Sequence, residues 1–120
     1  SAGIQWYNGF KMTIGATGTA IGTGQANTTA IVTAQGAGSY AAQLCDDLTE
    51  GGYSDWFLPS LDELVKLCDN RVAIGGFADP KYWSSSEDLY HEAWTQWFKR
   101  GTTDNHDKSM TFRVRAVRAF

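Results

Sequence analysis

GYSDWFLPSLDEL, residues 52–64, carries the strongest local signals for structure in this chain of 120 residues. Ser60 followed three positions later by Glu63 is a capping box, in which each side chain binds the other residue's backbone N–H at a helix start. The apolar residues that follow have the spacing of one helix face; they are Leu61, Leu64, Val65 and Cys68. We therefore predict a helix that begins after Ser60, preceded by an aromatic connector over residues 53–59.

Upstream of this stretch, residues 40–49 predict a second main helix, because one stripe is apolar; its members are Ala41, Leu44, Cys45 and Leu48. Gly51-Gly52 should end that helix, since glycine tolerates the left-handed backbone found after helix C-termini. A shorter helix is expected over residues 27–35, with Asn27 as its N-cap. It follows a Gly/Thr-rich loop over residues 15–24 and a strand-like segment over residues 4–14.

Downstream, the sequence becomes rich in β-formers. We expect strands over residues 82–86, 93–99 and 111–120, with residues 101–110 as a polar loop between the last two. Helices followed by antiparallel strands predict an α+β fold with two main helices packed on the sheet. The length suits one domain over residues 1–120, and because the chain does not begin with Met we expect it to be cut from a longer protein.

The formal net charge of −3 hides a segregated distribution. Residues 46–92 hold eleven acidic and three basic residues, whereas residues 93–120 hold six basic and two acidic ones. A chain that is acidic on average can therefore still present a basic face to an anionic partner.

Several function classes lack their motifs. The glycines of residues 15–24 fit neither the phosphate loop nor the dinucleotide fingerprint. His91, His106 and Ser84-Ser85-Ser86 lie in no catalytic pattern, so we expect no enzyme and no cofactor. No nucleic-acid-binding signature is present and the pI is about 5.2, which argues against nucleic acid. No apolar run approaches the ~20 residues of a membrane helix, so no membrane insertion is expected.

Two further groups of residues allow alternatives. Residues 104–107 (DNHD) offer oxygen and nitrogen ligands, but they lack the spacing of an EF-hand. We favour a solvated loop and predict no metal. Cys45 and Cys68 each lie on the apolar side of a predicted helix. Two buried free thiols are favoured, and a disulfide between the helices is the alternative.

The last strands predict a binding surface, because side chains alternate between the faces of a strand. If Trp94 and Phe98 point inward, the outer face carries Trp97, Lys99, Arg113 and Arg115, with Arg100 and Lys108 beside it. Guanidinium groups bind anions through paired hydrogen bonds, and an aromatic ring can stack on a sugar. We therefore predict ligand binding by Trp97, Lys99, Arg100, Lys108, Arg113 and Arg115. The alternative is that Arg115 and Arg118 pair with acids of residues 46–92.

Several separated motifs also resemble one family. They are residues 52–60 (GYSDWFLPS), Glu63-Leu64, residues 82–87 (YWSSSE), Ala93-Trp94 and residues 114–118 (VRAVR). In this order they resemble the bacterial domain found at the C-terminus of the Legionella collagen-like adhesin (Lcl). The resemblance implies a C-type-lectin-like fold on the bacterial surface that binds sulfated glycosaminoglycans, does not catalyse, and forms a homotrimer with its collagen stalk. Many members have a cysteine where this chain has Ala116, which implies that Cys45 lacks its usual partner.

Three hypotheses follow for the function. The first is an adhesin domain that binds an anionic or sulfated polysaccharide through the basic sheet face. The second is a protein-binding display module, as in variable phage or bacterial receptors, that uses the same face and residues 101–110. The third is a cap that trimerises a stalk.

Overall fold

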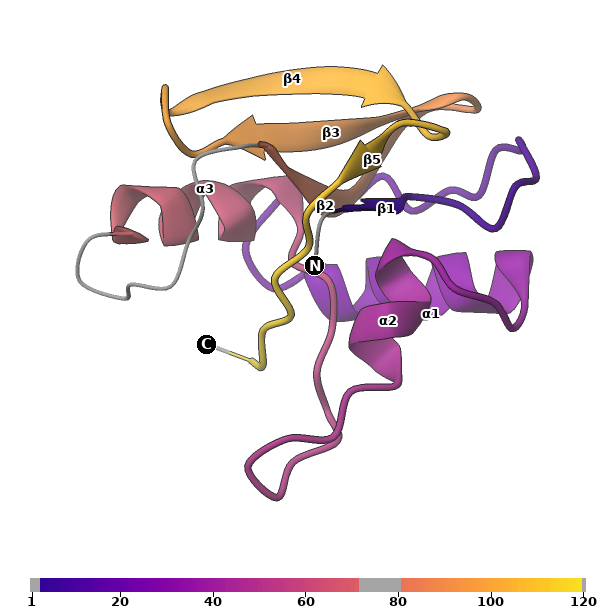
Figure 1. Ribbon diagram of the computed structural model, residues 1–120, viewed down its shortest axis with the longest axis horizontal. Coiled ribbons are helices and arrows are strands. Elements are labelled where there is room, and N and C mark those ends of the chain that lie inside the picture. The colour runs from indigo at the N-terminus through magenta and orange to yellow at the C-terminus, as the bar shows by residue number, and fades with distance from the viewer. Residues whose placement is uncertain (1–2, 72–80, 120) are drawn as a thin grey trace.

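The computed structural model describes residues 3–71 and 81–119. Its elements follow one another in the order β1 (Ile4–Gln5), α1 (Gly24–Gln35), α2 (Ala41–Asp46), α3 (Leu61–Asp69), β2 (Lys81–Leu89), β3 (Glu92–Trp97), β4 (Thr102–Asp107) and β5 (Thr111–Phe112) (Figure 1). The α+β class is therefore confirmed. The narrower assignment to C-type-lectin-like folds stays a prediction.

The strands form two small antiparallel sheets. β2, β3 and β4 make a three-stranded sheet in that order, and β1 pairs with β5. Ile4 lies opposite Phe112, so the N-terminal segment pairs with the last strand of the chain. A single parallel bridge between Tyr82 and Arg113 joins this ribbon to the free edge of β2.

The core has two clusters of buried side chains. The larger one gathers Trp6 and Trp83 with residues of α1 and α2, and the smaller one gathers Tyr82 and Phe98 with Leu64 of α3. Tyr82 and Trp83 are adjacent in β2, and adjacent side chains of a strand point to opposite faces. β2 is thus buried on both of its faces.

The capping box is confirmed at the start of α3. The Ser60 hydroxyl accepts a hydrogen bond from the Glu63 backbone N–H, and the Glu63 carboxylate accepts one from the Ser60 N–H at 2.8 Å. The second oxygen of Glu63 accepts from the Gly22 N–H at 2.9 Å. The carboxylate therefore also fastens the loop before α1 to α3.

The other two helices differ from their predicted bounds. α1 begins at Gly24, so Asn27 lies inside the helix, where its buried amide donates to the Gly18 carbonyl. α2 ends at Asp46, and Leu44, expected in the core, is 45% exposed. Gly51 and Gly52, with φ of +63° and +84°, form a tight turn in the loop after α2 rather than the helix end itself.

The largest error concerns residues 101–110, which are not a loop. β4 lies within them and is the hairpin partner of β3, whereas the segment after residue 110 forms only the short strand β5. β4 is an edge strand whose first four side chains are exposed. Because most of β4 is exposed, its sequence lacks the alternation of apolar and polar residues that identifies a half-buried strand.

Both cysteines are free and buried in the structure. Cys45 belongs to the larger core cluster and Cys68 to the smaller one, which agrees with the favoured prediction. Within residues 3–71 and 81–119, no helix has the length and apolar character needed to cross a membrane. The same residues contain no group of three or more potential metal ligands.

Candidate anion-binding surface

Trp97, the last residue of β3, carries two cations on its ring. Lys81 lies opposite it in β2, and the Lys81 Nζ is 5.0 Å from the ring centroid. The Arg100 guanidinium carbon is 4.7 Å from the same centroid. Both distances are within the range at which a cation is attracted by the electron-rich face of an indole.

Lys81 also reaches across the sheet to β4. Its Nζ donates a hydrogen bond to Asp104 Oδ2 at 3.3 Å and another to His106 Nε2 at 2.7 Å. The Lys81 side chain is only 18% exposed, so these contacts hold its ammonium against the sheet. We call the five residues joined in this way the Trp97 cluster: Lys81, Trp97, Arg100, Asp104 and His106.

His106 is neutral at neutral pH in this arrangement. Burial and the neighbouring Lys81 cation lower the pKa of His106 below its usual 6.5, and Asp104 and Glu92 oppose this shift. An ammonium can only donate, so the His106 Nε2 must be the unprotonated acceptor. Its ring packs 4.9 Å from the ring of Phe112.

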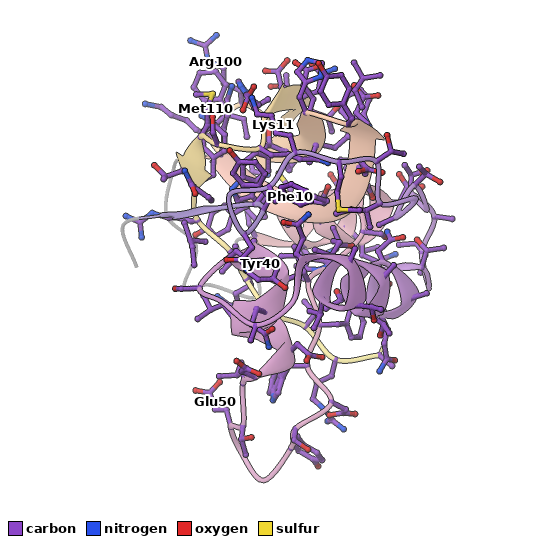
Figure 2. The ribbon with its side chains drawn as sticks, turned by 90° about the vertical axis from the view of Figure 1, so that its right-hand side faces the viewer. Phe10, Lys11, Tyr40, Glu50, Arg100 and Met110 are labelled. Carbon is purple, nitrogen blue, oxygen red and sulfur yellow. The ribbon has the colours of Figure 1, made fainter. Side chains whose placement is uncertain are left out.

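The turn between β3 and β4 adds exposed positive charge to the cluster. Lys99 and Arg100 are both exposed, and Figure 2 shows Arg100 projecting from the outer edge of the molecule. Gly101, with φ of +72°, lets the turn close through its N–H, which donates to the Trp97 carbonyl at 2.7 Å. Arg100 is thereby fixed beside the Trp97 ring, and Lys99 is a second exposed cation in the same turn.

The family is shown by comparison with known proteins. The chain matches the Lcl C-terminal domain family over residues 1–118. It belongs to that family. A search of curated proteins finds no match for the chain. Membership favours a surface module of the adhesin kind, and the ligand has to be inferred from the chemistry of this chain.

The structure divides the basic residues predicted for this Lcl C-terminal domain. Trp97 and Arg100 are in contact, and Lys99 lies in the same turn. Arg113 is in parallel register with Tyr82, and bridged residues share a face of the sheet. It therefore lies on the face opposite to Trp97, so the predicted common face is wrong. Arg115 lies further along the chain and is half-buried.

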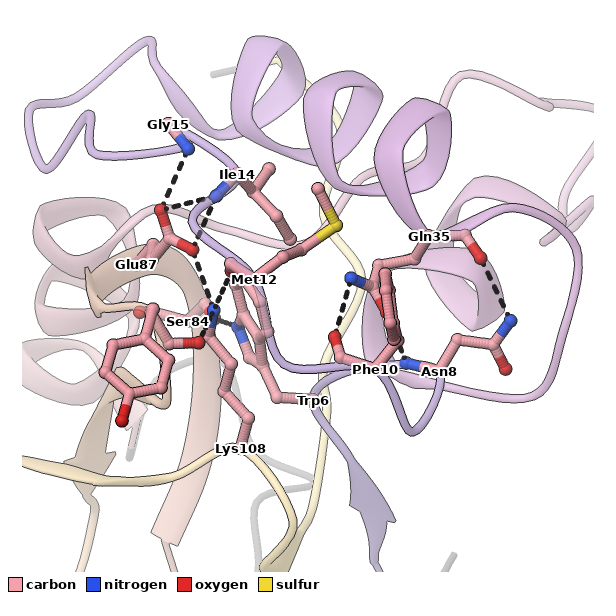
Figure 3. Close-up of polar contacts among 11 residues, drawn as sticks. Trp6, Asn8, Phe10, Met12, Ile14, Gly15, Gln35, Ser84, Glu87 and Lys108 are labelled. Atoms are coloured by element: carbon pink, nitrogen blue, oxygen red, sulfur yellow. Dashed lines mark hydrogen bonds and ion pairs between the residues drawn. The ribbon is translucent and has the colours of Figure 1, made fainter.

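The prediction that Lys108 belongs to the exposed surface is wrong. Its side chain is fully buried, and its Nζ lies 2.7 Å from Glu87 Oε2. The Nζ also donates to the carbonyls of Met12 and Tyr90, and it lies 4.6 Å from the centroid of the Trp6 ring (Figure 3). Burial lowers the pKa of Lys108, while the Glu87 carboxylate opposes this shift. An ammonium enclosed in this way cannot meet an external ligand.

Arg118 forms an ion pair with an acid of residues 46–92, which was the alternative to ligand binding. Its guanidinium forms two hydrogen bonds with the Asp55 carboxylate, at 2.6 and 3.1 Å, and lies 3.4 Å from the Tyr53 ring centroid. The pair ties the C-terminal segment to the loop after α2.

Sequence reasoning missed Lys81 and Asp104 as members of the candidate surface. Both acquire their place only through the register of the sheet, in which Lys81 opposes Trp97 and Asp104 opposes Thr95. Recognising β4 as a strand is the step that would have found Asp104.

Proposed function

We propose that this Lcl C-terminal domain is a cell-surface adhesin module that binds an anionic, sulfated polysaccharide at the Trp97 cluster and Lys99. The contact between Arg100 and Trp97 carries the proposal. A guanidinium held on an aromatic face has lost part of its conformational freedom before it meets a ligand, which lowers the entropic cost of binding.

The chemistry of the ligand follows from the two exposed cations. A guanidinium donates paired hydrogen bonds to an oxyanion, and Lys99 supplies a second positive charge in the same turn. A sulfated sugar chain presents such anions repeatedly. In this arrangement the Trp97 ring positions the Arg100 guanidinium. This role takes the place of the stacking on a sugar that the sequence suggested for Trp97.

Several copies would strengthen a contact of this size. A homotrimer, as expected from the resemblance, brings three surfaces to one polymer, and linked sites gain affinity without new contacts. Sedimentation equilibrium of the domain tests this part independently, since a strict monomer at high concentration contradicts it.

The function is tested with a heparin-derived oligosaccharide and its desulfated counterpart. We expect the sulfated form alone to bind, with an affinity that falls steeply between ~50 and ~200 mM salt, as for other polyanions. Arg100→Ala and Lys99→Ala should each weaken binding. Lys66→Ala is the matched control, because Lys66 is an exposed cation on α3. An equal loss in all three variants would contradict a local site.

A protein receptor is a second candidate, favoured by a separate observation. Phe10, Tyr90 and Met110 are 66%, 57% and 44% exposed, and Figure 2 shows Phe10 and Met110 on the same side of the molecule with Lys11. Exposed aromatic side chains are typical of binding hot spots. Phe10→Ser with Tyr90→Ser should then reduce attachment to cells that lack sulfated glycans, with heparin binding unchanged; unaltered attachment would contradict this candidate.

A further inference from the structure

The contact between Lys81 and His106 depends on the protonation of one imidazole. The 2.7 Å separation of Nζ and Nε2 is a hydrogen bond only while Nε2 carries a lone pair. The chain has two histidines, and His106 is the one that lies in the Trp97 cluster. The other, His91, is in the turn between β2 and β3.

Protonation of His106 would place two cations in direct contact. An imidazolium donates from both nitrogens, so its Nε2 can no longer accept from Lys81. Asp104 Oδ2, at 3.3 Å, then remains as the acceptor for the Lys81 ammonium among the contacts described above. The surface gains one positive charge, and Lys81 loses its shorter inward hydrogen bond.

The groups around His106 set the direction of this response. β2 contributes Lys81, β3 contributes Glu92 and β4 contributes Asp104, while β5 contributes the uncharged ring of Phe112. β1, paired with β5, contains only Ile4 and Gln5. Burial and Lys81 together outweigh the two carboxylates and lower the pKa of His106, so His106 is neutral at pH 7 and takes up its proton only below its usual pKa of 6.5.

We propose that His106 makes anion binding at the Trp97 cluster acid-dependent. While its imidazole is neutral, Lys81 donates to both His106 and Asp104; when the imidazole is protonated, Lys81 keeps the longer contact with the exposed Asp104 and turns more readily toward a ligand anion. The affinity for a sulfated polysaccharide therefore rises as the pH falls. This inference rests on the proposed function and specifies how the same surface is regulated.

The experiment measures the affinity for a sulfated heparin oligosaccharide by calorimetry at pH 7.5 and pH 5.0 and at constant salt. We expect wild type to bind about threefold to fivefold more tightly at pH 5.0, the effect of one added surface charge contact. His106→Gln should show no such gain, because its amide can accept from Lys81 but does not titrate. His91→Gln is the matched control and should respond as wild type does.

The outcomes separate this inference from the proposed function. Binding that is equal at the two pH values, or a response lost in His91→Gln but kept in His106→Gln, overturns the inference and leaves the proposed function standing. Absence of binding at both pH values overturns the proposed function and this inference with it.

NMR of the free wild-type protein tests the contact without any ligand. Neutral His106 should be the Nδ1–H tautomer, since its Nε2 accepts from Lys81. Its titration midpoint should rise in Lys81→Met, because the neighbouring cation is removed. The Nε2–H tautomer, or an unchanged midpoint in Lys81→Met, would overturn the inference.

Discussion

Lys108 and Glu87 form an ion pair inside the protein, with 2.7 Å between Nζ and Oε2 and side chains that are 0% and 2% exposed. The Glu87 carboxylate also accepts hydrogen bonds from the backbone N–H groups of Ile14 and Gly15. Figure 3 shows how these contacts bind the N-terminal segment to the sheet. The pair joins three parts of the chain that are far apart in sequence.

Lys108→Met should destabilise the protein by about 3–5 kcal/mol, because it leaves a buried carboxylate without its cation. Urea unfolding measures this change. Lys11→Met is the control, since it breaks the pair between Lys11 and Asp107, whose side chains are 42% and 34% exposed. An exposed pair contributes at most about 1 kcal/mol. Similar losses in the two variants would contradict the structural role of Lys108.

Acid should weaken the fold partly through Asp107. Its carboxylate accepts hydrogen bonds from the Ser109 hydroxyl and N–H, and these contacts, helped by Lys11, lower its pKa from 3.8 to about 2. The unfolded chain therefore takes up this proton first as the pH falls. The stability contributed by Asp107 is complete above about pH 4 and is lost progressively toward pH 2.

Asp107→Asn should flatten the dependence of the unfolding free energy on pH between about 4 and 2. Ser109→Ala should flatten it in part, because the largest cause of the low pKa is the hydrogen bond from the Ser109 side chain. Denaturant unfolding at a series of pH values provides the measurement. An Asp107→Asn profile as steep as that of wild type would show that other carboxylates set the acid response.

The features that the sequence predicted well are local ones. Ser60 and Glu63 are three residues apart, so the physics of the capping box is contained in one helical turn. Lys108 and Glu87 are 21 residues apart, and no pattern near either residue identifies the other as its partner. A basic residue in a polar stretch is usually exposed, so the sequence around Lys108 predicts a surface position.

The sequence predicts only those members of the candidate surface that are close together in the chain. Trp97, Lys99 and Arg100 are neighbours in the chain, and the turn after β3 places the Arg100 guanidinium on the Trp97 ring. Lys81 joins them only through the pairing of β2 with β3. Arg113 would share that face only if its strand paired with β3, and the edge of β3 is occupied by β4 instead.

Gly24, in the first turn of α1, should not tolerate a side chain. A Cβ there would lie 2.9 Å from Phe57 Cε2 and from the Ser60 nitrogen, and would also meet Glu63 Oε1. Gly24→Ala should therefore destabilise by about 1–3 kcal/mol, as overpacking does, although alanine favours helices by about 1 kcal/mol over glycine.

Thr33→Ala, at an exposed position of the same helix, provides the comparison for Gly24→Ala. It should stabilise the protein by about 0.5 kcal/mol through helix propensity alone. Thermal or urea unfolding of both variants decides the matter. A stabilising effect of Gly24→Ala would contradict the close packing of Gly24 against Phe57, Ser60 and Glu63.

Asp104 should limit the affinity of the proposed site, because its carboxylate occupies the Lys81 ammonium that a ligand anion would use. We expect Asp104→Asn to bind the sulfated oligosaccharide more tightly than wild type at pH 7.5, by about twofold to fivefold for one released surface pair. Asp107→Asn is the control, because it removes the same charge from the same strand. Asp107 pairs with Lys11, at the end of β4, and not with Lys81. If both variants gain equally, the effect is one of net charge; a gain confined to Asp104→Asn places the anion at Lys81.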